Sequence, residues 1–195
     1  FDESGEYELT QDIDAMSVGA VPYVIPLFSG KLYGNGHKIS NLLLTDISAR
    51  QKNARYIGFI GEAGSNASIN DTVFDNCTLM IRNSYGIVKA AGCIIGKIIG
   101  KAQLNNCHIT ATVCQTTPVT LDTTVNIGVI FGQINQYMIN SASICNSSIM
   151  FAMFSNNSVI PLLGFSSSGI EMKNVLIAYL DNHYSKDFNA ISELQ

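Results

Sequence analysis

One short motif recurs along the chain and constrains its fold more than any other feature. The pattern is Ile-x-Asn-x-x-Leu with small variations, and its five copies are centred on Asn41, Asp71, Asn106, Asn146 and Asn174. Successive copies lie 28 to 40 residues apart, a spacing typical of solenoids and other repeat arrays. The motif therefore predicts one structural unit that repeats along the chain.

A second motif, a short apolar run ending in glycine, alternates with the first. Its copies are Ile57–Gly61, Gly92–Gly96, Gly128–Gly132 and Pro161–Gly164. Both motifs are rich in β-branched and aromatic residues bounded by Gly, Asn and Ser, as strands are, and hairpin signals are scarce after Gly36. We therefore predict an all-β fold, a parallel β-helix (solenoid) of about five coils stacked about 4.8 Å apart.

The asparagine of the first motif has a physical meaning in such a fold. At a corner, asparagine can adopt the left-handed conformation and satisfy backbone groups of the turn. Stacked asparagines can also form a ladder of side-chain amides. We interpret Asn41, Asp71, Asn106, Asn146 and Asn174 as one structural column. The register is ambiguous near Asp71, because Phe74–Leu79 also fits the motif.

A tight turn is expected just before the first full copy of the motif. In the stretch Gly34-Asn35-Gly36, the Asn-Gly pair tolerates the positive φ angles that such turns require. The alternative is a flexible loop that presents His37 and Lys38 for chemistry. No motif supplies His37 with a catalytic partner, so we interpret the stretch as a structural turn.

The repeats divide the chain into three parts. Residues 1–25 are expected to form an N-terminal cap or lead-in strand, residues 26–180 the β-helix repeats, and residues 181–195 a C-terminal cap or linker. The chain begins with Phe1 and not with methionine. We therefore expect a processed product or a part of a larger protein.

Composition excludes several classes of protein. Of the 195 residues, 47% are hydrophobic and 13% charged, which is apolar enough for a core and argues against disorder. The net charge is −4, and the Lys and Arg residues are scattered, so nucleic-acid binding is not expected. No uncharged apolar run reaches the roughly 20 residues of a membrane span. The sequence thus predicts no direct membrane insertion.

The residues that could carry chemistry form no recognisable site. The five cysteines match no zinc spacing, so we interpret them as buried small hydrophobes, with a single disulfide as the alternative. A polysaccharide-cleaving β-helix would need two converging carboxylates. The best candidates are Asp46 and Asp75, at comparable offsets from their motifs, and we interpret them as exposed strand residues. We expect no catalytic residue, no metal ligand and no cofactor.

Five Asn-x-Ser/Thr sequons are candidate N-glycosylation sites if the protein is secreted from a eukaryotic cell. They lie at Asn66, Asn70, Asn76, Asn146 and Asn156. Asn146 belongs to the structural column and is the least suited to carry a glycan.

Three stretches resemble GLUG-type repeat proteins. They are YELTQDID (Tyr7–Asp14), PLFSGKLYGNGHKISNLLL (Pro26–Leu44) and IGFIGEAGSNASINDTVFDNCTL (Ile57–Leu79). The resemblance implies that the β-helix is right-handed and exposed outside the cell, since such repeats occur in surface and secreted proteins, including adhesins. Tyr33 stands where the family often has aspartate. The change removes a carboxylate from the turn and so argues against a metal or catalytic role there.

These observations together predict a non-catalytic structural or adhesive module of a larger extracellular or cell-surface protein. Its expected partners are other surface, matrix or filament proteins and glycans. One alternative is a carbohydrate-active enzyme of the β-helix type, a polysaccharide hydrolase or lyase. The other is a component of a filament or scaffold assembly.

Overall fold

The computed structural model describes most of the chain. The described residues are 2–47, 49, 53–82, 87–115, 125–134, 141–155, 163–165, 170–180 and 189–190. Of these residues 64% lie in strands, and η1 (Ala15–Val18) is a short 3-10 helix. Among them, no helix is long and apolar enough to span a membrane.

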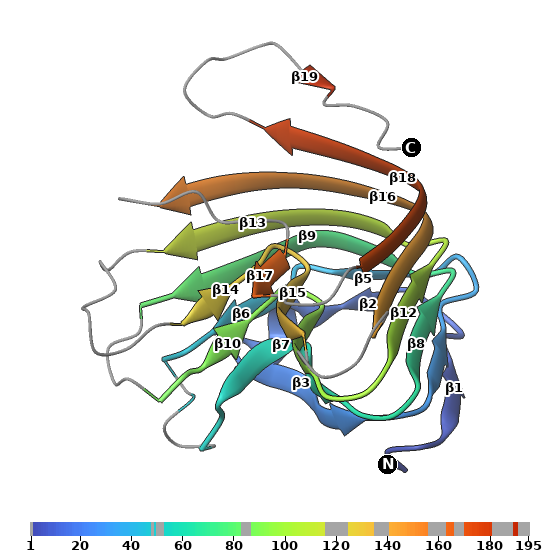
Figure 1. Cartoon of the computed structure of the whole chain (residues 1–195), viewed down its shortest axis with the longest axis horizontal. Coiled ribbons are helices and arrows are strands. Elements are labelled where there is room, and N and C mark those ends of the chain that lie inside the picture. Colours follow the sequence, from blue (N-terminus) through green and yellow to red (C-terminus); the bar gives the residue numbers. More distant parts are fainter. Residues whose placement is uncertain are drawn as a thin grey trace.

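Two sheets contain all the strands (Figure 1). In the twelve-stranded sheet the main order is β1 (Glu6–Glu8), β4 (Lys31–Tyr33), β8 (Ala67–Asn70), β12 (Ala102–Asn105), β16 (Ala142–Ser155), β13 (His108–Gln115), β9 (Val73–Ile81), β5 (Lys38–Ser40) and β2 (Ile13–Asp14); β6 (Leu43–Thr45) pairs with β9, β18 (Ile170–Leu180) with β16, and β19 (Asn189–Ala190) with β18. The seven-stranded sheet has the order β14 (Asn126–Ile127), β10 (Ala90–Ala91), β7 (Tyr56–Ala63), β11 (Ile95–Ile98), β15 (Phe131–Ile134) and β17 (Leu163–Phe165), with β3 (Tyr23–Phe28) beside β7.

Equivalent positions of the first motif lie side by side. Ile69 of β8 pairs with Leu104 of β12, which pairs with Ile144 of β16, and Ile144 pairs with Met172 of β18. Every strand pair described is parallel except β18 with β19. Each copy of the motif therefore places one strand next to the equivalent strand of the copy before it.

The expected right-handed parallel β-helix of about five coils is wrong. The strands instead form two parallel sheets, one a half-barrel and the other a nearly closed barrel. Five equal coils would need the same corners in every copy. One corner, occupied by Asn41 between β5 and β6, has no counterpart within β16, a single strand of 14 residues. Long strands twist and coil together. The sheet therefore curves smoothly along β16, whereas a β-helix would turn at a corner there.

The division into a cap or lead-in strand at residues 1–25, repeats at 26–180 and a cap or linker at 181–195 stays a prediction. Strands β1 and β2, within residues 1–25, pair with β4 and β5 as internal strands do. Of residues 181–195, the structure describes only β19.

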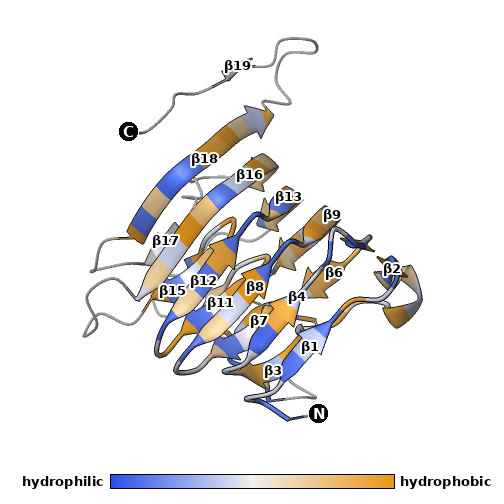
Figure 2. Ribbon diagram, turned by 90° about the vertical axis from the view of Figure 1, so that its right-hand side faces the viewer, coloured by the Kyte–Doolittle hydropathy of each residue, from blue (hydrophilic) through white to orange (hydrophobic). Residues whose placement is uncertain are grey.

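The core fills the space inside the curved sheets. Hydrophobic and hydrophilic residues alternate along the strands of the twelve-stranded sheet (Figure 2), as expected when one face is buried. The rings of Phe59 and Phe74 meet edge to face at 5.2 Å, and Phe28 and Phe131 are fully buried nearby in the same core cluster. Aromatic and β-branched side chains thus supply most of the buried apolar area.

The predicted asparagine column exists as two rows. All five of its residues have positive φ, between 51° and 58°. Asp71, Asn106, Asn146 and Asn174 follow one another along neighbouring strands. Asn41 does not join them. Ser40 pairs with Asp75, so Asn41 lies beside Asn76, whose φ is also positive at 54°. The stretch Phe74–Leu79, which also fits the first motif, is therefore the partner of the copy centred on Asn41.

The left-handed conformation of Asn106 generates a first prediction. In Asn106→Ala and Asn106→Gly the same side-chain amide is lost, but only alanine is strained at a φ of 52°. We expect Asn106→Ala to lower the free energy of unfolding by about 1 kcal/mol more than Asn106→Gly. Urea denaturation of both variants measures the difference. Equal stability, or a more stable alanine variant, would contradict a strained corner.

The cysteines generate a second prediction. All five are free; Cys77, Cys93 and Cys107 are buried. Burial raises the pKa of Cys77 to about 12, that of Cys107 to about 11, and that of Cys93 well above its usual value. Because the thiolate is the reactive form, we expect these three to resist iodoacetamide at neutral pH while half-buried Cys145 reacts.

Mass spectrometry after timed labelling measures the rate at each cysteine. Labelling in urea is the control, in which all five should react at similar rates. Rapid modification of Cys93 in the folded protein would contradict the burial described here.

Candidate functional site

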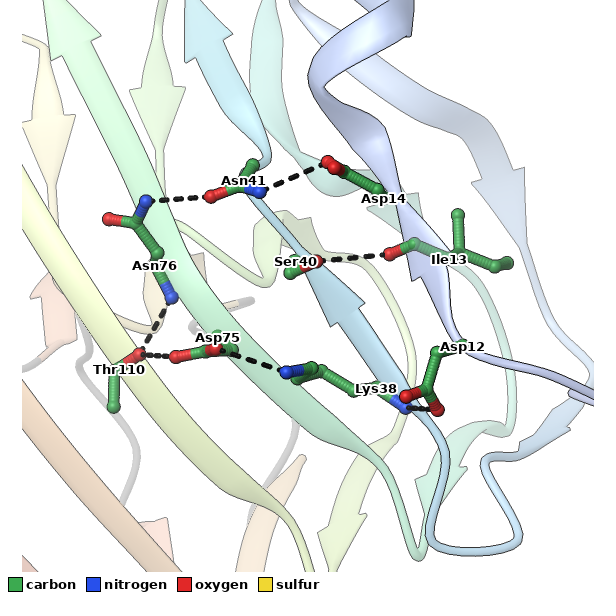
Figure 3. Close-up of polar contacts among 9 residues, drawn as sticks. All are labelled: Asp12, Ile13, Asp14, Lys38, Ser40, Asn41, Asp75, Asn76 and Thr110. Atoms are coloured by element: carbon green, nitrogen blue, oxygen red, sulfur yellow. Dashed lines mark hydrogen bonds and ion pairs between the residues drawn. The ribbon is translucent and has the colours of Figure 1, made fainter.

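Polar side chains gather on the outer face of the twelve-stranded sheet, where β2, β5, β9 and β13 lie side by side (Figure 3). Ile39, Phe74 and Ile109 point into the core at paired positions of these strands. The residues that flank them therefore point outward. We call this set the polar ladder: Asp12, Asp14, Lys38, Ser40, Asn41, Asp75, Asn76 and Thr110.

One row of the polar ladder is built from side-chain amides. Asn41 Nδ2 donates to Asp14 Oδ1 at 3.0 Å, and Asn76 Nδ2 donates to Asn41 Oδ1 at 2.8 Å. The row ends at β13, where Thr110 alone faces both Asp75 and Asn76 and the strand register shifts as in a β-bulge. The backbone N–H of Asn76 donates to Thr110 Oγ1 at 2.7 Å.

The other row alternates in charge from strand to strand. Asp12 Oδ1 accepts from the backbone N–H of Lys38 at 3.0 Å and lies 3.1 Å from His37 Nδ1. Lys38 Nζ lies 3.6 Å from Asp75 Oδ2, and Thr110 Oγ1 donates to Asp75 Oδ1 at 3.0 Å. Opposite charges on neighbouring strands stabilise a sheet modestly. These contacts also fix the positions of the charged groups of Asp12, Lys38 and Asp75 on the surface.

Two carboxyl groups of the polar ladder, those of Asp12 and Asp14, have pKa values below the ordinary value. A hydrogen bond from the backbone of Lys38, and then one from His37, lowers the pKa of Asp12. The backbone N–H of Met16, and then the amide of Asn41, lowers the pKa of Asp14. A general acid at neutral pH needs the opposite shift. Asp12 and Asp14 are therefore suited to binding donors and cations and not to giving up a proton.

The predicted turn at Gly34-Asn35-Gly36 positions this surface. Asn35 and Gly36 have φ of 53° and 78°, and the N–H of His37 donates to Gly34 O at 2.8 Å. A Cβ at Gly34 would overlap the carbonyl oxygen of Asp71, so only glycine fits. The turn also places His37 beside a partner, Asp12. The sequence did not reveal this pair, because the two residues are 25 positions apart and share no motif.

The proposed carboxylate pair does not form. Asp75 is paired with Ser40, whereas the residue before Asp46, Thr45, is paired with Met80. Asp46 is buried and accepts from the backbone N–H of Arg82 at 3.0 Å. It closes a turn and is not an exposed strand residue. In the part of the chain described, no three His, Cys, Asp or Glu side chains are grouped to hold a metal ion.

A second series of amides runs beside the polar ladder. Asn106 Nδ2 donates to Asp71 Oδ1 at 2.7 Å, Asn146 Nδ2 to Asn105 Oδ1 at 3.2 Å, and Asn174 Nδ2 to Asn146 Oδ1 at 3.0 Å. We call it the amide row. The predicted column thus contributes to both polar surfaces.

The sequon asparagines differ in their freedom to carry a glycan. Asn66 is exposed at a bend, outside any strand. Asn70 is half-buried and donates to Ser68, while the amides of Asn76 and Asn146 donate within the two rows. Asn156 lies outside the described residues. A glycan on Asn76 or Asn146 would remove a hydrogen bond from these rows, whereas one on Asn66 would not.

The lowered pKa values generate a third prediction. A carboxyl whose folded pKa lies below its ordinary value of 3.8 stabilises the fold above that value, and this stabilisation is lost as the pH falls through the folded pKa. Hydrogen exchange at the amides of Lys38 and Met16, which donate to Asp12 and Asp14, should therefore become less protected on going from about pH 6 to about pH 2.5.

The amide of Ile60 is the control, because its acceptor is the carbonyl of Ile94 and does not titrate. Protection factors corrected for intrinsic exchange rates are the quantity to compare. If Lys38 and Ile60 respond to pH alike, the carboxylate of Asp12 does not hold β5 in place.

Comparison with known proteins adds no family. No protein-family model matches the chain, and a search of curated proteins finds no significant match. The resemblance to GLUG-type repeats therefore stays a prediction, and the function has to be argued from the geometry of the surface.

Proposed function

We propose that this protein is a non-catalytic structural and contact module of a larger extracellular or cell-surface assembly. Its partners in this proposal are other surface or matrix proteins and glycans. The observation that carries the proposal is the polar ladder, in which exposed carboxylate, ammonium, amide and hydroxyl groups are linked to one another across four neighbouring strands.

A surface of this kind is well suited to binding an extended polar partner. Neighbouring strands place equivalent groups about 4.8 Å apart. Groups already held by hydrogen bonds lose little conformational entropy when a partner binds, which lowers the cost of association. The alternation of Asp12, Lys38 and Asp75 also fixes which charges the partner must present.

The same geometry disfavours a polysaccharide-cleaving enzyme at this surface. Such an enzyme needs one carboxyl group with a raised pKa and a second one converging on the same bond. Asp12 and Asp14 have lowered pKa values, and their oxygens already accept backbone hydrogen bonds.

A filament or scaffold component is the second candidate, and the cysteines favour it. All five are free, and three lie in the core. Free thiols persist more readily in reducing compartments than outside the cell. A scaffold would use the same contact surface with different partners.

Cross-linking mass spectrometry on native material, followed by binding assays with the partners found and with a glycan array, tests the proposal. The polar ladder is broken in Lys38→Ala/Asp75→Ala and left intact in the control Lys101→Ala, which changes an exposed lysine outside it. We expect the double variant to lose at least about tenfold in affinity, because it removes an ion pair and a charge-assisted contact, with the control unchanged.

Melting temperatures of both variants verify that the fold is kept. Equal binding by a folded double variant would show that the polar ladder is not the contact surface. Release of new reducing ends from a polysaccharide by the wild-type protein would overturn the non-catalytic role.

A further inference from the structure

A small cleft lies on the other sheet, where β3 pairs with β7. Its volume is about 170 Å³, and Tyr23, Pro26, Arg55, Tyr56, Gly61 and Glu62 are among the residues that line it. We propose that this cleft binds a single neutral sugar ring, as one unit of a glycan. The inference rests on the proposed function in taking a glycan as partner, and it assigns a site that is separate from the polar ladder.

The floor of the cleft is backbone and its walls are aromatic. Gly61 has no side chain, and a Cβ there would lie 2.8 Å from Pro26 O and 3.3 Å from the ring of Tyr23. Tyr23 begins β3 and Tyr56 begins β7. The glycine thus lets the ring of Tyr23 lie against the backbone of β7, where it forms a fixed aromatic wall, and the face of a sugar ring is a ligand that packs against such walls.

One wall is fixed by a lysine from the next strand. Lys97 Nζ of β11 donates to Tyr56 Oη at 3.1 Å and lies 4.7 Å from the centre of its ring. This contact combines a hydrogen bond with a cation–π interaction. Because the lysine donates, the hydroxyl hydrogen of Tyr56 is left to donate to a ligand.

The charged groups of the cleft lack partners of their own. Glu62 is half-buried, and its carboxylate has no hydrogen bond or ion pair with any residue that the structure describes, although Lys97 is its paired neighbour on β11. The guanidinium of Arg55 is exposed and equally unpaired within the described chain. Among the described residues the carboxylate oxygens of Glu62 are not among the buried polar atoms without a partner, so they are open to hydroxyl donors from a ligand.

The combination of groups selects a neutral polyhydroxylated ligand. Arg55 and Lys97 repel a metal cation, while Glu62 offsets one of their two positive charges and so weakens the attraction for an inorganic anion. Hydroxyl groups can donate to Glu62 and accept from Arg55, while the ring stacks on tyrosine. The cleft is small, about 170 Å³, and is open to solvent. It holds one ring, so the rest of a glycan chain would continue into solvent.

Saturation-transfer NMR with a panel of neutral monosaccharides tests the site. We expect at least one sugar to bind the wild-type protein, and Glu62→Gln to weaken it by about tenfold or more, because a hydrogen bond to a charged acceptor becomes one to a neutral acceptor. Glu171→Gln is the matched control, since Glu171 is exposed on β18 away from the cleft. Tyr56→Phe keeps the ring and removes the hydroxyl, and it serves as the second variant if Glu62→Gln does not fold.

Three results would overturn the inference. They are the absence of binding by every sugar, equal weakening by Glu62→Gln and Glu171→Gln, or displacement of the sugar by free amino acids, which would make the site one for a zwitterion.

The two proposals fail separately. Loss of glycan-array binding in Lys38→Ala/Asp75→Ala but not in Glu62→Gln would keep the polar ladder as contact surface and overturn the cleft. The reverse pattern would keep the cleft and overturn the polar ladder.

Discussion

The fold depends on a backbone conformation that few residues adopt without strain. Asparagine or aspartate takes positive φ in every described copy of the motif, from Asn41 to Asn174, either between two strands or, as in β16 and β18, within one. Each of these residues turns the chain, and its side chain then bonds to a neighbouring strand. Turning and cross-linking are thus done by the same residue. This coupling holds the parallel strands in one register over long separations in sequence.

Burial and surface chemistry follow from that register. With Ile69, Leu104 and Ile144 aligned, alternate residues of each strand face one core, and the residues between them face solvent together. The polar ladder and the amide row are the outward result of the pattern that builds the core inward. The cleft is different in origin, because it needs a glycine at position 61 of β7, where Pro26 and Tyr23 of the neighbouring strand β3 lie close.

Local features of this fold could be predicted from the sequence, and the larger ones could not. The turn at Gly34-Asn35-Gly36 and the left-handed corners follow from single residues, and the parallel strands from one motif. The partner of Asn41 could not be chosen, because Asp71 and Asn76 both fit the motif. The closure of the sheets depends on twist summed over long strands such as β16, which no short motif encodes. The meeting of Tyr23 with Glu62 requires β3 to pair with β7 first.

The amides of both rows are oriented the same way. Asn41, Asn76, Asn106, Asn146 and Asn174 each donate toward the N-terminal side of the stack of strands. Aligned hydrogen bonds polarise one another, so the bonds of each row add up to a small electrical dipole along the row. Each row begins with an aspartate that accepts a hydrogen bond, Asp14 in the polar ladder and Asp71 in the amide row, and the amide row ends at Asn174, whose carbonyl oxygen is also an acceptor. A strand added beside either end of the amide row would therefore extend the row only by donating hydrogen bonds to these acceptors.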